Sequence, residues 1–240
     1  VNDFKWLVQF IPVCPEIAIG MPAPRVTIRL IQKKGEDVKL VSSVKGIDFT
    51  EKMQSFSKKY IQKTLNKSID GFILKAKSPT CGTDKIKVYS AAGNSQPLGS
   101  VQNGMFAEEI VNQYEDYPIE SERRLSNFII REHFYIRVFT TARFREIRNK
   151  PMKHLVKFHS NHKYLFMTFN QETMKTMGNI VANHTKSSLE EVYDLYHQSL
   201  LTLLKTPVSK EKRINVLSHI YGYFKDFLTD AEKEYYFETQ

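Results

Sequence analysis

The sequence predicts an α/β domain followed by an all-α domain, and two observations carry this prediction. From the first residue to about residue 143, short β-rich runs alternate with stretches of helical periodicity. This alternation is typical of an α/β unit, and we expect a Rossmann-like, mostly parallel sheet. After Phe144 the helical periodicity continues and no convincing strand remains. We therefore expect an α/β domain over residues 1–143 and an all-α domain over residues 144–240.

Within the first part, apolar or alternating runs predict five strands. They cover residues 7–13, 26–31, 38–41, 71–76 and 86–89, and the first has the composition of a buried strand. Helical spacing after the capping residues Asp48 and Thr50 predicts a helix there. Further helices are expected over residues 106–114 and 122–136, and the Gly-, Asn- and Ser-rich residues 93–104 predict a long loop.

Five helices are expected in the second part. They cover residues 152–164, 171–185, 188–205, 210–228 and 230–237. In the third of them, apolar side chains recur at helical spacing from Leu189 to Leu204 and form one stripe. Pro207, followed by Ser209 and Glu211, marks a break and the start of the next helix.

Composition limits the class of protein. At 28.0 kDa and 41% apolar residues the chain can bury a substantial core. It has no 18-residue apolar run that would predict a membrane span. Two cysteines do not make a disulfide framework, so we expect a reducing, cytoplasmic environment. The net charge of +9 and a pI near 9.3 favour a polyanionic partner such as nucleic acid, although a basic but otherwise ordinary enzyme is the alternative.

The two cysteines are the candidate functional residues of the first part. Cys14 and Cys81 each follow a β-rich run and lie in a turn rich in Pro or Gly. Loops at strand ends are where α/β proteins commonly place their chemistry. Two thiols are fewer than the three or four ligands of a zinc or iron–sulfur site. From the residues alone, two packing thiols are the favoured interpretation.

The segments around both cysteines carry a resemblance. Val13-Cys14-Pro15-Glu16 and Ser78-Pro79-Thr80-Cys81-Gly82 are similar to segments of the TudS/RudS-type desulfidase family, which acts on thiouracil or on 4-thiouridine in tRNA. Residues 19–25, 71–75, 87–89, 104–107 and 122–125 also resemble this family. Residues 158–163 and 215–225 resemble its helical companion domain.

The resemblance implies a [4Fe-4S] cluster and a truncated chain. Cys14 and Cys81 would be two of three thiolate ligands, which leaves one iron open to the thiocarbonyl sulfur. The family's first cysteine lies in a segment before residue 1, and its helical domain ends later than residue 240. We therefore expect a chain shortened at both ends, in which the third ligand is missing and the cluster itself can be absent.

The resemblance also implies roles for other residues. Glu16 would shuttle protons and Ser78 would position water or substrate. Arg25, Lys75 and Lys77 would bind phosphate or offset the negative charge of the cluster. Taken without the resemblance, Glu16 has a second interpretation as a helix-capping residue, and Ser78-Pro79 is also an ordinary turn.

The implied activity is removal of sulfur from 4-thiouridine in tRNA, which yields uridine and hydrosulfide. Two alternatives stay open. One is a cluster-free RNA-binding or accessory protein that keeps the fold, and the other is a desulfurase of free thiouracil-type bases. The partner is accordingly tRNA or a smaller thiolated pyrimidine.

Three groups in the helical part have both a functional and a structural interpretation. The histidines are metal ligands, RNA-facing residues or polar packing residues: His159, His162 and His219. The aromatic group stacks on bases or belongs to the core: Tyr221, Tyr223 and Phe224, followed by Lys225. The lysines track phosphates or form a solvated face: Lys150, Lys153, Lys157 and Lys163.

Overall fold

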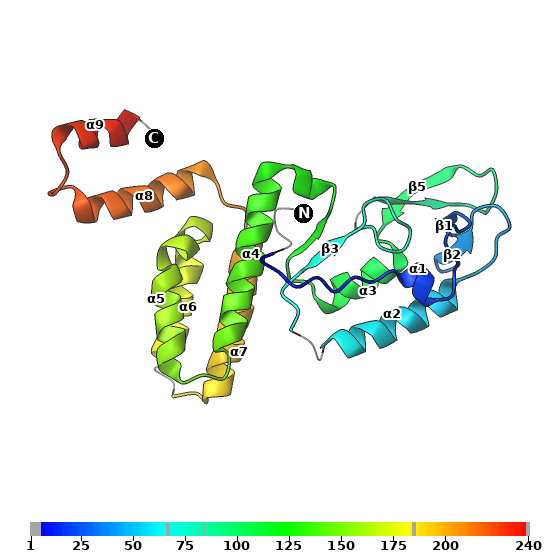
Figure 1. Ribbon diagram of the computed structural model, residues 1–240, viewed down its shortest axis with the longest axis horizontal. Coiled ribbons are helices and arrows are strands. Elements are labelled where there is room, and N and C mark those ends of the chain that lie inside the picture. The colour runs from blue at the N-terminus through cyan, green and yellow to red at the C-terminus, as the bar shows by residue number, and fades with distance from the viewer. Residues whose placement is uncertain (1–5, 66–67, 84, 184–185, 239–240) are drawn as a thin grey trace. The chain divides into compact units, whose positions relative to one another are not determined.

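The protein divides into two compact units, Val1–Tyr135 and Ile136–Gln240. The computed structural model describes residues 6–65, 68–83, 85–183 and 186–238 (Figure 1). The first unit combines strands with helices, and the second contains helices and no strand among its described residues. The expected order of an α/β region followed by a helical region is therefore confirmed.

A four-stranded sheet forms the larger part of the first unit's β structure. It contains β1 (Ile28–Ile31), β2 (Lys39–Ser42), β4 (Ile86–Tyr89) and β5 (Pro97–Gln102) in the order β2-β1-β4-β5. β1 is parallel to β4, but β1 and β2 are antiparallel and so are β4 and β5. A separate parallel pair joins β3 (Phe72–Leu74) to β6 (Ile119–Ser121).

The expectation of a mostly parallel, Rossmann-like sheet is therefore wrong. The reason lies in the connections: residues 32–38 alone join β1 to β2, and residues 90–96 alone join β4 to β5. A link this short returns the chain in the opposite direction, whereas a parallel neighbour needs a crossover of about a dozen residues or more. The parallel pair β1–β4 meets this requirement, because the chain between these two strands is long and contains β2, α2 and β3.

Among the described residues, three α-helices belong wholly to this unit: α1 (Pro15–Ala18), α2 (Thr50–Leu65) and α3 (Met105–Gln113). The core joins Leu30 and Leu40 of the sheet to Met53 of α2 and Phe106 of α3, and all four side chains are fully buried. In Figure 1, α2 and α3 run along the same side of the strands. The sheet thus packs its helices against one face, which agrees with the alternation of apolar and polar residues in β1 and β4.

Several local predictions for this unit need correction. Residues 7–13 form no strand, and four of their apolar residues are between 37% and 46% exposed: Leu7, Phe10, Ile11 and Val13. The segment is apolar, but a strand also requires a hydrogen-bonded neighbour, and none of the described strands pairs with it. The loop expected over residues 93–104 contains β5, which pairs with β4 despite its Gly-rich composition, and β6 was not anticipated.

One long helix begins in the first unit and ends in the second. A short 3₁₀ turn, η2 (Arg124–Ser126), precedes α4 (Phe128–Ile147), where the sequence predicted one helix over residues 122–136. Asn127 separates the two elements and its side chain accepts hydrogen bonds from the N–H groups of Ile129 and Ile130. α4 therefore has its own cap and starts later than predicted.

The helical unit continues with five helices among the described residues: α5 (Met152–Phe169), α6 (Gln171–Ala182), α7 (Leu189–Lys205), α8 (Lys210–Phe224) and α9 (Asp230–Glu238). Its core includes Phe144, Phe166, Tyr196 and Leu200, all at most 1% exposed. Ser188 caps α7 in a reciprocal pair with Glu191. Within the described part of the chain, no helix has the length and apolarity that a membrane span requires.

Candidate thiol site

Cys14 lies between a carboxylate and a guanidinium group. It is the residue before α1, and Pro15 at the first helical position starts this short helix. The Cys14 Sγ donates to Glu16 Oε2 at 3.2 Å and accepts from Arg25 Nη1 and Nη2 at 3.6 and 3.5 Å. Arg25 Nη1 also lies 3.8 Å from Glu16 Oε2. The Cys14 thiol is therefore in contact with both a carboxylate and a permanently charged guanidinium group.

The Cys81 loop is held by the start of α3. The N–H groups of Met105, Phe106 and Ala107 donate to the carbonyl oxygens of Pro79 and Thr80, at 2.9 to 3.0 Å. The first N–H groups of a helix have no partner within the helix, so the loop supplies one. Gly104 precedes this turn, and a Cβ there would lie 2.5 Å from the carbonyl carbon of Thr80. Close backbone contact with α3 thus fixes the loop.

Hydroxyl groups in this loop form a chain that ends on Glu16. Ser78 Oγ accepts from the N–H groups of Thr80 and Cys81, at 3.2 and 3.1 Å, and lies 2.8 Å from Thr80 Oγ1. Thr80 Oγ1 in turn donates to Glu16 Oε1. Because two donors already occupy the lone pairs of Ser78 Oγ, the Ser78 hydroxyl proton points toward Thr80. Ser78 therefore donates to Thr80, and Thr80 donates to Glu16.

Glu16 links the two cysteine loops through Thr80. Thr80 Oγ1 is 3.6 Å from Cys81 Sγ, while the other oxygen of Glu16 contacts Cys14. Burial raises the pKa of the Glu16 carboxyl, but hydrogen bonds from Thr80 and Cys14 and the charge of Arg25 outweigh this effect and leave the pKa below its usual value. Glu16 is therefore an ionised proton acceptor at neutral pH.

The Cys81 thiol lies in a different environment from the Cys14 thiol. Burial raises the pKa of Cys81 to about 12, and the nearby charge of Glu16 acts in the same direction. A thiol with this pKa is protonated at neutral pH. Binding of a metal ion would have to displace that proton, because cysteine coordinates metals as the thiolate.

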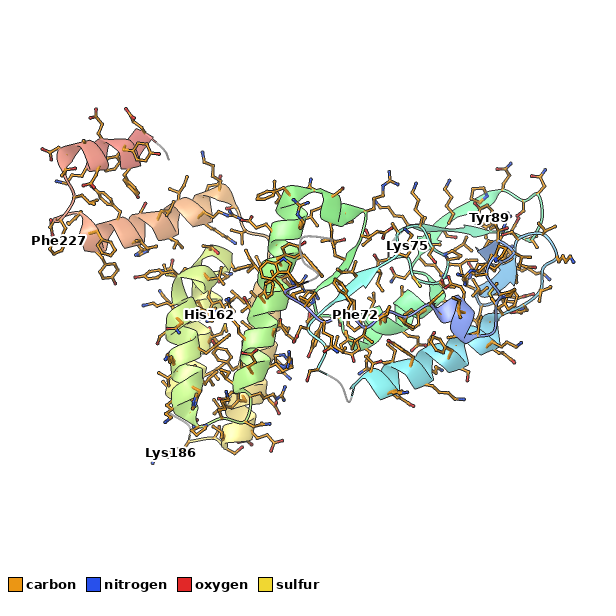
Figure 2. All side chains as sticks on the ribbon, in the orientation of Figure 1. Phe72, Lys75, Tyr89, His162, Lys186 and Phe227 are labelled. Atoms are coloured by element: carbon orange, nitrogen blue, oxygen red, sulfur yellow. The ribbon has the colours of Figure 1, made fainter. Side chains whose placement is uncertain are left out.

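Five of the seven predicted site residues gather at this site: Cys14, Glu16, Arg25, Ser78 and Cys81. The two lysines lie elsewhere. Lys75 is paired with Glu122 at 2.8 Å and its side chain is 72% exposed; Figure 2 labels it. Lys77 lines a separate pocket beside β1 and β4. Neither lysine has a contact with the two thiols among the described residues.

Thr80 is the residue that sequence reasoning missed. It is fully buried, and it connects Ser78, Glu16 and Cys81. Its place directly before Cys81, in a loop with a second hydroxyl two residues earlier, was the available signal. That signal is weak by itself because Ser and Thr are common in turns for reasons that do not involve catalysis.

The donor set was compared with the needs of an iron–sulfur cluster. Cysteine thiolates are the right ligand type, and two of them lie on loops joined by Glu16 and Thr80. However, no group of three or more His, Cys, Asp or Glu side chains that could hold a metal ion occurs among the described residues. Those residues therefore do not complete a cluster site by themselves.

The candidate residues of the helical unit have mainly structural contacts. His159 Nδ1 lies 3.0 Å from the buried Tyr196 hydroxyl, and His162 Nδ1 lies 2.8 Å from the Phe158 carbonyl oxygen. Burial lowers the pKa of both histidines. His219 is exposed. These contacts favour the packing interpretation for the first two histidines over the metal interpretation.

The aromatic and basic candidates divide between packing and exposure. Tyr221 stacks on Tyr236 of α9 with ring centroids 4.2 Å apart, so its ring is engaged within the protein. Tyr223 and Phe224 are more than half exposed, and Lys225 is exposed with them. The four lysines of the α5 region are exposed as well: Lys150, Lys153, Lys157 and Lys163. Exposure is compatible with either of their two interpretations.

The fold and the site together define a two-unit protein with a thiol–carboxylate site in its α/β unit. The chain belongs to the 2-thiouracil desulfurase family, whose model matches residues 1–122. A second family model, described as a protein of unknown function (DUF1722), matches residues 163–239. Both matches agree with the resemblance seen in the sequence.

Individual relatives cover only parts of the chain. The uncharacterized protein YbgA of Escherichia coli (strain K12) is 28% identical over 102 residues, which are 41% of this chain and 60% of that protein. The chain thus matches less than two thirds of this curated relative. A solved structure of a [4Fe-4S]-dependent thiouracil desulfidase, TudS, is 23% identical, covers 52% of this chain and 75% of its own, and superposes with a TM-score of 0.38.

Proposed function

We propose that this protein is a desulfidase that removes sulfur from a thiolated pyrimidine, and that its substrate is 4-thiouridine in tRNA. Family membership supports the class of reaction. The observation that carries the proposal is the convergence of Cys14 and Cys81 on one carboxylate, Glu16, through direct contact with Cys14 and through Thr80 for Cys81. The basic composition of the chain supports a polyanionic substrate.

The reaction replaces sulfur by oxygen without any change in oxidation state. Water adds to the thiocarbonyl carbon, the carbon–sulfur bond breaks, and the products are the carbonyl compound, hydrosulfide and one proton. Glu16 is ionised and therefore suited to accept the proton of the attacking water. The Ser78 and Thr80 hydroxyls orient that carboxylate through their hydrogen bonds.

Arg25 and the thiols act on the sulfur side of the reaction. The guanidinium of Arg25 donates to Cys14 Sγ through two nitrogens, which places a permanent positive charge beside this sulfur. We propose Cys14 and Cys81 as ligands of a [4Fe-4S] cluster, with further donors from outside the described residues. Such a cluster supplies a thiophilic Lewis acid when it is bound.

The two parts of the chain have separate roles in this proposal. The α/β domain, residues 1–143, carries the chemistry, and the helical domain, residues 144–240, helps to hold RNA. Exposed Tyr223, Phe224 and the lysines of the α5 region are the candidate RNA contacts. Lys75 is less suited to a role at the thiols because its ion pair with Glu122 directs it elsewhere.

The experiment is a hydrosulfide-release assay after anaerobic reconstitution with iron and sulfide. The substrates are tRNA that contains 4-thiouridine and free 2-thiouracil, and visible absorbance reports the cluster. We expect release from the thiolated tRNA, and we expect Cys14→Ser and Cys81→Ser to abolish both release and absorbance. Ser95→Ala is the matched control, because Ser95 lies half-buried in the loop before β5 and its hydroxyl donates to the carbonyl oxygen of Ala91, away from both cysteine loops.

Each alternative function predicts a different result. Release from 2-thiouracil but not from tRNA would identify a desulfurase of free bases. Iron binding that persists in Cys81→Ser would remove Cys81 from the ligand set. Binding of tRNA without release of hydrosulfide, by a chain that takes up no iron at any length of its native sequence, would identify an RNA-binding protein and refute the catalytic proposal.

A further inference from the structure

A basic pocket lies on the α/β unit beside the loop that carries Cys81. In β4, Ile86 and Val88 are buried, while Lys87 and Tyr89 lie on the opposite face of the strand. In β1, Leu30 is buried in the core, so Arg29 lies on that same outer face. Figure 2 labels Tyr89 near β1 and β5. The sequence alternation thus gathers two cations and an aromatic ring on one side of the sheet.

The pocket has a volume of about 360 Å³, which falls within the size range of small-molecule sites, roughly 300 to 1,000 Å³. Among the described residues, its lining includes four cationic side chains and no acidic one: Arg29, Lys77, Lys85 and Lys87. None of these four has an ion pair with an acidic side chain among the described residues. A concave site with this concentration of positive charge attracts an anion.

Arg29 is held in place with part of its donor capacity unused. Its Nη1 donates to the carbonyl oxygen of Gly93 at 2.8 Å, and its guanidinium carbon lies 4.4 Å from the centre of the Tyr89 ring. Its Nε is buried and has no hydrogen-bond partner within the described structure. A guanidinium fixed by a hydrogen bond and by stacking presents its positive charge at the pocket, where it is suited to bind an oxyanion.

The two loop lysines of the pocket share an uncommon backbone conformation. Lys77 and Lys85 both have φ of 59°, in the left-handed region, and they are the non-glycine residues of the first unit with positive φ among those described. Such conformations concentrate at functional sites. Two such residues at one pocket indicate that the surrounding structure holds the backbone there in a conformation that lysine rarely adopts.

The Cys81 loop connects this pocket to the thiol site. Lys77 and Pro79 line the pocket, while Ser78 and Thr80, which alternate with them along the chain, belong to the hydroxyl chain. One loop therefore contributes side chains to both places. An anion bound in the pocket and a base bound at the thiols would contact the same five-residue segment.

We infer that this pocket binds a phosphate group of the thiolated substrate. The inference rests on the proposed function and adds a binding site for a phosphate of the substrate, either a nucleotide's own phosphate or one in an RNA chain. The shared ligand chemistry is a phosphate oxyanion received by Arg29 and by the lysines around it. Free thiouracil lacks this group and gains nothing from the pocket.

The test removes charge from the pocket at two exposed positions. Lys85→Asn combined with Lys87→Gln is the pocket variant, because asparagine tolerates the left-handed conformation of residue 85. Lys58→Gln combined with Lys59→Gln on the exposed surface of α2 is the control with equal charge loss. Binding of a labelled single-stranded RNA is measured by fluorescence anisotropy over a range of salt concentrations.

We expect the pocket variant to lower the salt slope of RNA binding by about 0.7, the value for one lost phosphate contact on a single strand. The control should leave the slope at the wild-type value. Equal slopes for wild type and both variants would overturn the inference. Because this measurement involves no turnover, it stands even if the protein proves not to be a desulfidase.

Activity distinguishes the two sources of phosphate. The catalytic efficiency kcat/KM is compared for 4-thiouridine, 4-thiouridine 5′-monophosphate and a thiolated oligonucleotide. A loss in the pocket variant for both phosphate-bearing substrates supports the nucleotide's own phosphate as the ligand. A loss for the oligonucleotide alone supports a neighbouring backbone phosphate. Equal losses on all three, 4-thiouridine included, would contradict a phosphate-specific site. A wild-type protein inactive on every substrate would refute the proposed function, not the pocket.

Discussion

Replacement of Thr80 by valine tests whether the buried hydroxyl holds the two cysteine loops together. Thr80 is fully buried, and the Glu16 side chain that it contacts is only 14% exposed. A hydrogen bond to a charged group contributes about 1.5–3 kcal/mol, and the loss of an acceptor for Ser78 costs about 1 kcal/mol more. The added methyl group recovers about 0.8 kcal/mol. We therefore expect Thr80→Val to lower the free energy of unfolding by about 2–3 kcal/mol.

Thr80→Ser is the matched control, because it keeps the hydroxyl and removes a methyl group instead. Its expected cost is about 0.5–1.5 kcal/mol, the usual range for the loss of one buried methyl group. Urea denaturation followed by circular dichroism measures both variants. With a slope of about 1–3 kcal/mol/M, the valine variant should unfold roughly 1 M earlier than wild type.

Hydrogen exchange gives the local measurement, which is needed because the chain has two compact units. Faster exchange of the amides of residues 78–82 in Thr80→Val, with unchanged exchange in α5–α7, would place the loss at the thiol site. If the valine variant were as stable as the serine variant and equally protected, the reasoning that Thr80 joins the loops through its hydroxyl would be refuted.

Two further predictions concern a glycine pair and the helical unit. Gly104→Ala should lower the free energy of unfolding of the α/β unit by about 1–3 kcal/mol, because the added Cβ would lie 2.5 Å from the loop backbone. Gly222→Ala is the control in open space within α8 and should raise the stability of the helical unit by about 0.5–1 kcal/mol. Thermal unfolding compares the two variants, and equal shifts in Tm would contradict the close contact at Gly104. The helical unit should lose stability as pH falls from about 7 through the ordinary histidine pKa of 6.5, because burial lowers the pKa of His159, His162 and His197 in the folded state and the unfolded chain therefore binds protons more readily. The free energy of unfolding should change by at most about 1.4 kcal/mol per pH unit for each histidine. A free energy of unfolding that stays constant between pH 7 and 5 would contradict this prediction.

The local elements of this protein were largely predictable because they depend on short-range patterns. The strand over residues 86–89 was predicted at its observed bounds, and the α7 helix differs by its capping residue alone. Period-two and period-3.6 patterns and caps are properties of neighbouring residues, which a sequence displays directly. Residues 7–13 show the limit of this reasoning, since apolar composition cannot supply a strand's hydrogen-bonded partner.

The pairing of strands and the composition of the site were decided by the tertiary structure. The sequence did not reveal that β2 and β5 flank a single parallel pair, because register and direction depend on contacts between distant segments. Nor did it identify Thr80, whose contact with Glu16 joins residues 64 positions apart. The same applies to Lys77, which the resemblance assigned to the substrate and which the fold places in a pocket with Arg29.

By itself, the sequence determined the order of an α/β region and a helical region, and its resemblance to a known family singled out two cysteine loops with Glu16, Arg25 and Ser78. Chain neighbours and turn chemistry are local, so these features needed no coordinates. Only the tertiary structure decided that one buried hydroxyl links those loops and that the strand faces gather a basic pocket beside them. Both arise from long-range packing, where the position of a side chain depends on every element that surrounds it.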